Sequence, residues 1–206
     1  MKILLIGATG MIGSRIAAEA SARGHEVTAA TRSGRTGITL DVTDPGRVAE
    51  AAAGHDAAVS AVSPPRDGSN PAAPLLAAYR SLLDGLRTAD VRRLLVVGGA
   101  GSLRTASGQD RVDTPDFPVI YKAESLAQRE VLRLLRADAD DLDWTYVSPA
   151  DEIAPGERTG TFQLGRDDLL TAEDGSSFIS AEDYAVAVVD ELENRYAIRR
   201  RITLAY

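Results

Sequence analysis

A loop with three glycines near the amino terminus has a spacing that could bind phosphate. The loop Gly7-Ala8-Thr9-Gly10-Met11-Ile12-Gly13 follows an apolar run at residues 2–6 and precedes a helical pattern over residues 11–23. Unpaired N–H groups and the dipole at a helix N-terminus favour a pyrophosphate, which glycine allows to approach the backbone. The first two glycines are one residue further apart than in G-x-G-x-x-G, but strand, turn and helix follow in the order of a dinucleotide site. The alternative is that the glycines serve only a tight turn. The residues assigned to this site are Gly7, Thr9, Gly10, Met11, Ile12 and Gly13.

The end of the second predicted strand bears on which dinucleotide would bind. A site for NAD places Asp or Glu about 20 residues beyond the glycine loop, against the ribose 2′-hydroxyl. Here Arg32 and Ser33 stand in that place, with Arg35 close by, and a guanidinium can make forked, charge-assisted bonds to a 2′-phosphate. We therefore expect NADP(H), with NAD(H) as the alternative if Arg32 is only a solvated surface arginine. Asp41-Val42 could meet the adenine, unless Asp41 is simply a turn or cap residue.

The rest of the chain alternates apolar runs with helical patterns, as parallel βαβ units do. Strands are predicted over residues 2–6, 26–31, 37–40, 56–61, 93–97, 144–147 and 202–205, and helices over residues 11–23, 45–53, 72–89, 121–136 and 181–192. The 206 residues therefore predict a single α/β domain with a Rossmann-type, doubly wound parallel sheet. Three segments follow strand ends, where such sheets bind ligands: residues 63–71, 98–118 and 150–180. We expect the last of them to form a small C-terminal cap.

Composition argues against several kinds of ligand. A net charge of −7 disfavours nucleic acid, and we interpret Arg199-Arg200-Arg201 as the solvated start of the last strand. The chain has no cysteine, which excludes disulfides and thiolate metal ligands. His25 and His55 precede strands, at the sheet edge opposite the glycine loop, so we expect no metal site and no histidine base. Without a long apolar run or a signal-peptide pattern, we expect no membrane span and a cytoplasmic protein.

Beyond the glycine loop, several segments resemble one protein superfamily in their order along the chain. They are Arg32, Asp41-Val42, Gly98-Gly99-Ala100-Gly101-Ser102, Tyr121-Lys122-Ala123-Glu124, Asp143-Trp144-Thr145-Tyr146-Val147-Ser148-Pro149 and Phe178-Ile179-Ser180-Ala181-Glu182-Asp183-Tyr184-Ala185. Together they resemble the atypical short-chain dehydrogenases/reductases, and within them the small NAD(P)H-binding proteins grouped with NADH-flavin reductases, biliverdin reductase B-like flavin reductases and NmrA-like proteins. The resemblance spans nearly the whole chain. It is specific for fold and cofactor and loose for substrate.

The resemblance implies where the nicotinamide would lie. The backbone of Ala61, Val62 and Ser63 would pass beneath the nicotinamide ribose. Ser148-Pro149-Ala150 would run beside the carboxamide, and Gly98 belongs to the same site. These would be backbone contacts that tolerate a change of side chain.

The resemblance also points to three candidate catalytic residues. Ser102 stands where relatives place a hydroxyl that binds substrate or carboxamide, although it could be only a loop serine. Lys122 is similar to a lysine of isoflavone-reductase-like relatives, near the nicotinamide ribose or donating a proton, although it could be only solvated. Tyr121 would act as a general acid if a lysine followed four residues later, but Ser125 stands there.

The expected activity needs little acid or base chemistry. Hydride transfer from NADPH to a flat flavin- or quinone-type acceptor requires stacking and orientation. Of the aromatic residues, Phe162 and Phe178 lie in the expected cap, whereas Trp144 and Tyr146 are more typical of a core. The alternative is a non-catalytic NADP(H)-sensing regulator of NmrA type. A nucleotide-sugar epimerase or dehydratase ranks third, because it needs a positioned acid and base. We expect a monomer or a homodimer.

Overall fold

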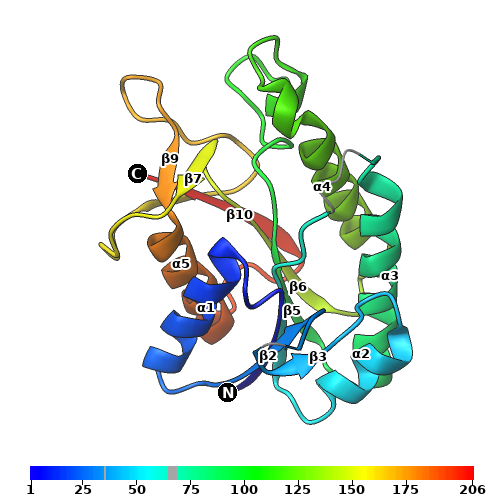
Figure 1. Ribbon diagram of the computed structural model, residues 1–206. Helices are drawn as coiled ribbons and strands as arrows, with labels where there is room; N and C mark the ends of the chain where they lie inside the picture. The colour runs from blue at the N-terminus through cyan, green and yellow to red at the C-terminus, as the bar shows by residue number, and fades with distance from the viewer. Residues whose placement is uncertain (35, 65–68) are drawn as a thin grey trace.

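The computed structural model describes residues 1–34, 36–64 and 69–206, and its described chain forms an eight-stranded, mostly parallel sheet with helices on both faces (Figure 1). The strand order is β3-β2-β1-β4-β5-β6-β10-β8. The strands of this sheet are β1 (Lys2–Ile6), β2 (Glu26–Thr31), β3 (Ile38–Thr39), β4 (Ala57–Ser60), β5 (Arg93–Val97), β6 (Asp143–Ser148), β8 (Gln163–Gly165) and β10 (Arg200–Ala205). A separate parallel pair is formed by β7 (Glu152–Ala154) and β9 (Phe178–Ser180). The Rossmann-type α/β fold is confirmed.

The helices form two layers because the strands are apolar on both sides. They are α1 (Met11–Ala22), α2 (Pro45–Ala52), α3 (Ala72–Thr88), α4 (Val119–Asp138) and α5 (Ala181–Asn194). In β1, Leu4 and Ile6 join the core under α2, α3 and α4, while Ile3 and Leu5 join the core under α1 and α5. Strands buried on both faces are near-continuous apolar runs, which is why these segments can be recognised in the sequence.

The segment after β6 differs from a simple cap. The strand β8 pairs antiparallel with β10 and so extends the main sheet, which is therefore not wholly parallel. The strands β7 and β9 pair beside it. Each of these three strands has only three residues, too few to show an alternation of polar and apolar residues.

The last strand and the fourth helix correct two further expectations. The strand β10 begins at Arg200, and Arg201 is buried at 4% exposure rather than solvated. Its guanidinium donates from Nε and Nη2 to the Asp167 carboxylate, and a paired charge of this kind can be buried. Helix α4 begins at Val119, directly behind Pro118, and so starts earlier than its apolar periodicity indicates. No helix in the described ranges is long and apolar enough to cross a membrane.

Candidate functional site

Two glycines of the loop between β1 and α1 are required by the protein's own packing. Gly7 has a φ of +83°, and a Cβ there would lie 2.5 Å from the Ala61 carbonyl oxygen, just beyond β4. A Cβ on Gly13 would lie 2.2 Å from the carbonyl oxygen of Gly7. The first and third glycines therefore fit the loop tightly between α1 and the neighbouring strand end.

The second glycine, Gly10, is not required by the packing of the described protein atoms. A Cβ on Gly10 would meet nothing in the described structure closer than the Gly7 carbonyl oxygen at 3.5 Å, and its φ of −70° suits any residue. Gly10 is the N-cap of α1, and it makes no side-chain capping bond in the described chain; the first turn carries no acidic residue. In the described structure no side chain caps the N–H groups of that turn, which leaves them available to a phosphate group. This arrangement fits the pyrophosphate of a dinucleotide.

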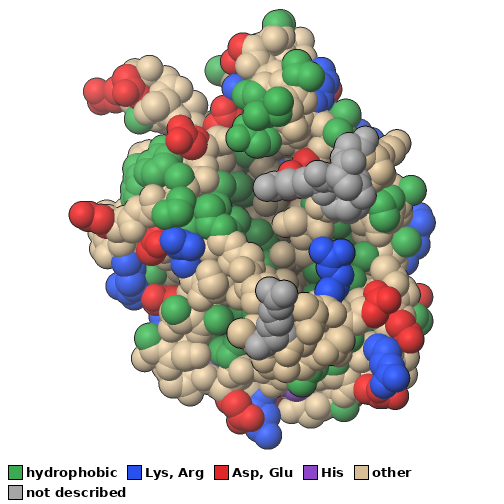
Figure 2. Space-filling model, in the orientation of Figure 1, with side chains coloured by type: hydrophobic (Ala, Val, Ile, Leu, Met, Phe, Trp, Pro, Cys, Tyr) green, Lys and Arg blue, Asp and Glu red, His purple; other side chains and the backbone are tan. Residues whose placement is uncertain are grey.

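The other residues expected around the cofactor lie at the same edge of the sheet. The Ala61 N–H donates to the Ile6 carbonyl at 2.8 Å, which places the chain after β4 beside the glycine loop. The Gly98 N–H donates to the Val147 carbonyl at 2.8 Å, which places the chain after β5 beside the end of β6. Val62 is partly exposed and Ser63 exposed, whereas Pro149 is buried. Figure 2 shows a hollow at this edge, near the centre of the face in view. These positions remain predictions as cofactor contacts.

Gly98 and Tyr146 fit together in the core behind this edge. A Cβ on Gly98 would lie 2.1 Å from the Tyr146 ring. The Tyr146 hydroxyl accepts from the Gly99 N–H at 3.1 Å and donates to the Gln128 carbonyl at 3.0 Å. Burial raises the pKa of Tyr146 to about 12, so the phenol stays neutral. Tyr146 and Trp144 are core residues, and Tyr146 fixes the strand ends instead of stacking on a ligand.

The loop after β2 exposes the residues expected to contact the 2′-phosphate. The Thr31 hydroxyl accepts from the Gly34 N–H at 3.1 Å, and this turn leaves Arg32 and Ser33 exposed. Arg35 lies outside the described residues. A guanidinium presented on such a turn can reach an anion without breaking an ion pair, since no salt bridge of Arg32 is found in the described structure.

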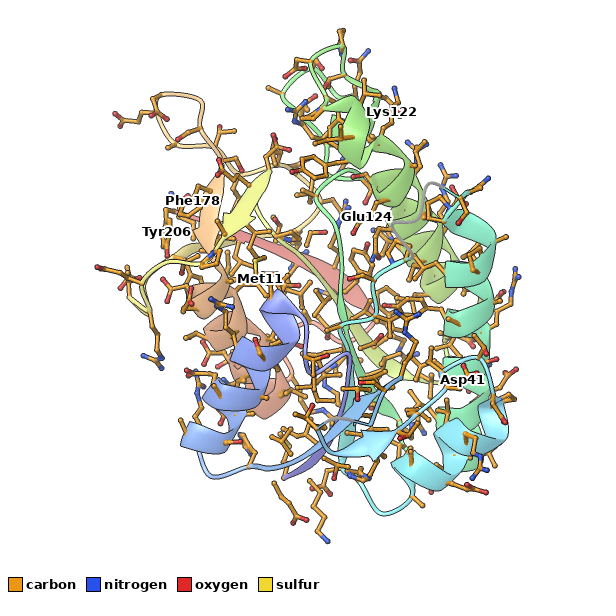
Figure 3. All side chains as sticks on the ribbon, viewed as in Figure 1. Met11, Asp41, Lys122, Glu124, Phe178 and Tyr206 are labelled. Carbon is orange, nitrogen blue, oxygen red and sulfur yellow. The ribbon has the colours of Figure 1, made fainter. Side chains whose placement is uncertain are left out.

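Asp41 and Val42 follow β3, and their contact with an adenine stays a prediction. The Asp41 carboxylate accepts from the Thr43 N–H at 3.0 Å and from the Thr43 hydroxyl at 2.7 Å. These bonds, and the charge of Arg32, lower the pKa of Asp41. Asp41 thus fulfils the alternative role of a turn residue, beside β3 and α2 (Figure 3). Val42 is 9% exposed and packs in the core, which leaves little of it to contact an adenine.

The three candidate catalytic residues are not assembled into one group. Ser102 is buried at 8% exposure, and its hydroxyl accepts from Nη1 of Arg201 at 2.8 Å, so it holds the loop after β5 rather than facing a substrate. Tyr121 is 54% exposed, and Lys122 is also exposed. Figure 3 shows Lys122 at the outer end of α4, apart from Met11 in the first turn of α1. No hydrogen bond joins Ser102, Tyr121 and Lys122 in the described structure.

A connecting segment that the sequence did not indicate runs between α5 and α1. It consists of residues 156–160 and is held by three carboxylates. Glu182 accepts from the Gly156 N–H at 2.7 Å, and Asp183 accepts from the Gly160 N–H at 2.8 Å. Arg158 donates to both oxygens of Glu19 on α1, at 2.7 and 2.8 Å. No local pattern could have indicated these contacts, because the paired residues are 23 to 139 positions apart.

The two histidines have structural partners. The ring nitrogens of His25 contact Glu193 and the amino terminus, at 2.8 and 3.2 Å. Those of His55 contact the Thr28 hydroxyl and the Ala52 carbonyl. Both rings are thereby fixed near the amino ends of strands. In the described residues, no group of His, Asp and Glu is arranged to hold a metal ion.

Comparison with known proteins agrees with this geometry. A family model for NAD(P)H-binding proteins matches residues 7–195. The uncharacterized protein YwnB of Bacillus subtilis is 40% identical over 214 residues, which cover 99% of this chain and 98% of YwnB. A crystal structure from Burkholderia pseudomallei, provisionally named an exported protein, is 50% identical with full coverage of both chains and a TM-score of 0.90. A Streptococcus pneumoniae structure, provisionally named an NADH-flavin reductase, is 37% identical over 100% of this chain and 99% of its own, with a TM-score of 0.83. The chain therefore belongs to the family of NAD(P)H-binding proteins.

Proposed function

We propose that this protein is an NADPH-dependent reductase that delivers hydride to a flat acceptor of flavin or quinone type. The observation that carries the proposal is the uncapped first turn of α1 at Gly10, which fits a dinucleotide. Among the described residues, the candidate acid and base groups Ser102, Tyr121 and Lys122 are not joined to one another by hydrogen bonds. Bound NADPH would supply the hydride, and a reduced flavin can take its proton from solvent. The similarity to a structure provisionally named an NADH-flavin reductase supports the same class of reaction.

The residues of this chain would bind and orient the two partners. The first turn of α1 would hold the pyrophosphate, and the exposed Arg32 would select the 2′-phosphate of NADP(H) over NAD(H). Figure 2 shows hydrophobic side chains gathered over β7 and β9, beside the hollow. Ile153 and Phe162 are partly buried there, and the ring of Phe178 lies 5.8 Å from that of Tyr206. A flat ring could stack on such a wall, which would also exclude water from the hydride path.

A reductase of this kind does not depend on a tyrosine and lysine pair. Tyr121 is followed by Ser125 instead of lysine four residues later, and both Tyr121 and Lys122 are exposed at the end of α4. An enzyme that protonates a carbonyl would need one of these groups positioned against it. A flavin or quinone acceptor would not.

The test follows NADPH and NADH absorbance with the purified protein and a panel of FMN, FAD, riboflavin and quinones. Turnover with NADPH supports the reductase and identifies its acceptor class. Tight NADPH binding without turnover of any acceptor refutes the reductase and favours a cofactor-sensing regulator. A cytoplasmic location stays a prediction, which cell fractionation can test, and so does a monomeric or homodimeric state, which sedimentation can test.

A further inference from the structure

A polar cavity of about 560 Å³ lies between the two long loops at the ligand edge of the sheet. One wall comes from residues 105–116, after β5, and the other comes from residues 151–152 and 169–177, around β7 and β9. Figure 1 shows these loops rising as two separate arms above the sheet. The chain enters the second wall at Asp151, two residues after Pro149. The volume falls in the range of about 300–1,000 Å³ that is typical of small-molecule sites.

Hydroxyl and amide groups make up much of this lining. The wall includes the side chains of Thr105, Ser107, Gln109, Thr114, Ser176 and Ser177. The Ser177 hydroxyl accepts from the Asp151 N–H at 3.1 Å, and its own proton meets no acceptor among the described residues. Hydroxyls and amides can both donate and accept, which suits the hydroxyl groups of a ligand.

The charges of the lining are predominantly negative. The described part of the wall contains three carboxylates, Asp116, Asp151 and Glu152, and one arginine, Arg111. Arg111 is already paired: its Nε donates to Asp151 at 2.9 Å, and its Nη1 lies 3.2 Å from Asp116. A hydrogen bond from Thr114 lowers the pKa of Asp116, which keeps this carboxylate ionised at neutral pH. The cavity therefore has an excess of two carboxylates and no uncommitted cation in its described lining.

We propose that this cavity binds the neutral, hydroxylated part of the electron acceptor and disfavours a phosphate at the same place. Carboxylates accept charge-assisted hydrogen bonds from hydroxyl groups, but they repel a phosphate dianion. The proposal rests on the proposed reductase function and adds a substrate class to it. Among flavins it favours riboflavin, whose ribityl chain ends in a hydroxyl, over FMN, whose chain ends in a phosphate.

The first test compares these two acceptors, which differ only in that phosphate. At low salt we expect riboflavin to have a kcat/KM at least about fivefold above that of FMN, because the repulsion between like charges is least screened there. Raising the ionic strength from ~0.01 M to ~0.15 M shortens the Debye length from about 30 Å to about 8 Å and should bring the two values together. An FMN kcat/KM equal to or above that of riboflavin at low salt overturns the proposal.

The second test uses charge variants with a matched control. The double variant Asp116→Asn/Glu152→Gln should raise kcat/KM for FMN and leave that for riboflavin within about twofold. The control Glu50→Gln/Asp84→Asn makes the same change in net charge on α2 and α3, away from the cavity, and should leave the ratio of the two acceptors unchanged. Equal changes in both double variants would show that net charge, and not the cavity, sets the preference.

A binding measurement separates this proposal from the reductase itself. Quenching of flavin fluorescence, titrated with the NADP⁺-loaded protein, reports affinity without turnover. Riboflavin binding tighter than FMN binding supports the cavity even if neither flavin is reduced, which would refute only the reductase. No riboflavin binding, or tighter FMN binding, overturns the cavity proposal whatever the turnover assay shows.

Discussion

Substituting alanine at Gly10 and at Gly13 should separate cofactor binding from folding. Both residues belong to the same loop, yet the structure gives them different neighbours. A Cβ introduced at Gly10 would lie 3.5 Å from the nearest described protein atom, an ordinary van der Waals contact, whereas a Cβ introduced at Gly13 would overlap the Gly7 carbonyl oxygen at 2.2 Å. Gly10→Ala should therefore leave the fold intact and obstruct the phosphate, while Gly13→Ala should disturb both.

The magnitudes follow from these contacts. At an N-cap, alanine stabilises a helix less than glycine does, by about 1 kcal/mol. Alanine also lowers the conformational entropy of the unfolded chain, which stabilises the folded state by about 0.4–1 kcal/mol. The two effects oppose each other, so Gly10→Ala should change the free energy of unfolding by less than about 1 kcal/mol. The overlap at Gly13 resembles overpacking, which costs about 1–3 kcal/mol. At about 2–4 °C per kcal/mol for a protein of this size, Gly13→Ala should lower Tm by about 2–12 °C. Loss of a charge-assisted contact in Gly10→Ala, at about 1.5–3 kcal/mol, weakens NADPH binding about tenfold to a hundredfold.

The assay pairs thermal unfolding without ligand with fluorescence titration of NADPH. The expected result is a near-native Tm and a raised Kd for Gly10→Ala, and a lower Tm for Gly13→Ala. If Gly10→Ala binds NADPH as tightly as the parent protein, the pyrophosphate does not lie against this turn. A large loss of Tm in Gly10→Ala would show instead that Gly10 is required for folding.

Three further predictions follow from single contacts. Arg32→Ala should remove a charge-assisted contact of about 1.5–3 kcal/mol to the 2′-phosphate, and so raise the Kd for NADPH about tenfold to a hundredfold and that for NADH little. Fluorescence titration with each cofactor measures both values, and an equal rise in the two Kd values would show that Arg32 does not contact the phosphate. Hydrogen bonds from Arg158 lower the pKa of Glu19 from 4.5 to about 2, so its stabilising effect is complete above pH 4.5 and is lost as the pH falls toward 2. Urea unfolding across this range should show a shallower pH dependence for Glu19→Gln, and curves parallel to those of the parent protein would contradict the pairing. Ser102→Ala removes a hydroxyl that accepts a hydrogen bond from Arg201, so it should lower the free energy of unfolding by about 1–3 kcal/mol and leave kcat unchanged. A lower kcat with an unchanged Tm would show instead that Ser102 takes part in catalysis.

The parts of the fold that depend on neighbouring residues could be read from the sequence. Residues 3–6 and 94–97 are apolar on both faces, and both lie in strands of the central sheet. The cap of α2 could also be predicted, since Asp44 accepts from the N–H groups of Gly46 and Arg47 with Pro45 at the start of the helix. Such signals arise within one or two turns of chain, so they survive without tertiary information.

The site could be predicted only in part, because its side chains find partners far along the chain. Arg201 appears in the sequence as one of three solvated arginines, but its partners Asp167 and Ser102 are 34 and 99 residues away. The same contact buries Ser102 beside Arg201, which a loop serine in a glycine-rich segment does not indicate. The spacing of a glycine loop is a local pattern that can be recognised in the sequence. The burial of a charge depends instead on a distant partner, which composition and periodicity do not identify.

The attachment of residues 166–177 has a consequence for how specificity can change in this family. The segment leaves the main sheet at Gly165, where β8 pairs with β10, and returns at Phe178, whose strand pairs with β7. Both ends are fixed by backbone pairing, and Asp167 at the start of the connection pairs with the buried Arg201 of β10. Residues 170–176 can therefore vary in length and composition without altering the sheet or the glycine loop, as long as Asp167 is kept. In the proposed reductase this stretch lines the acceptor cavity, so the acceptor preference would be exchangeable separately from the rest of the fold. Grafting the corresponding loop from a relative should transfer a preference for its acceptor while the nicotinamide half of the site stays as it is.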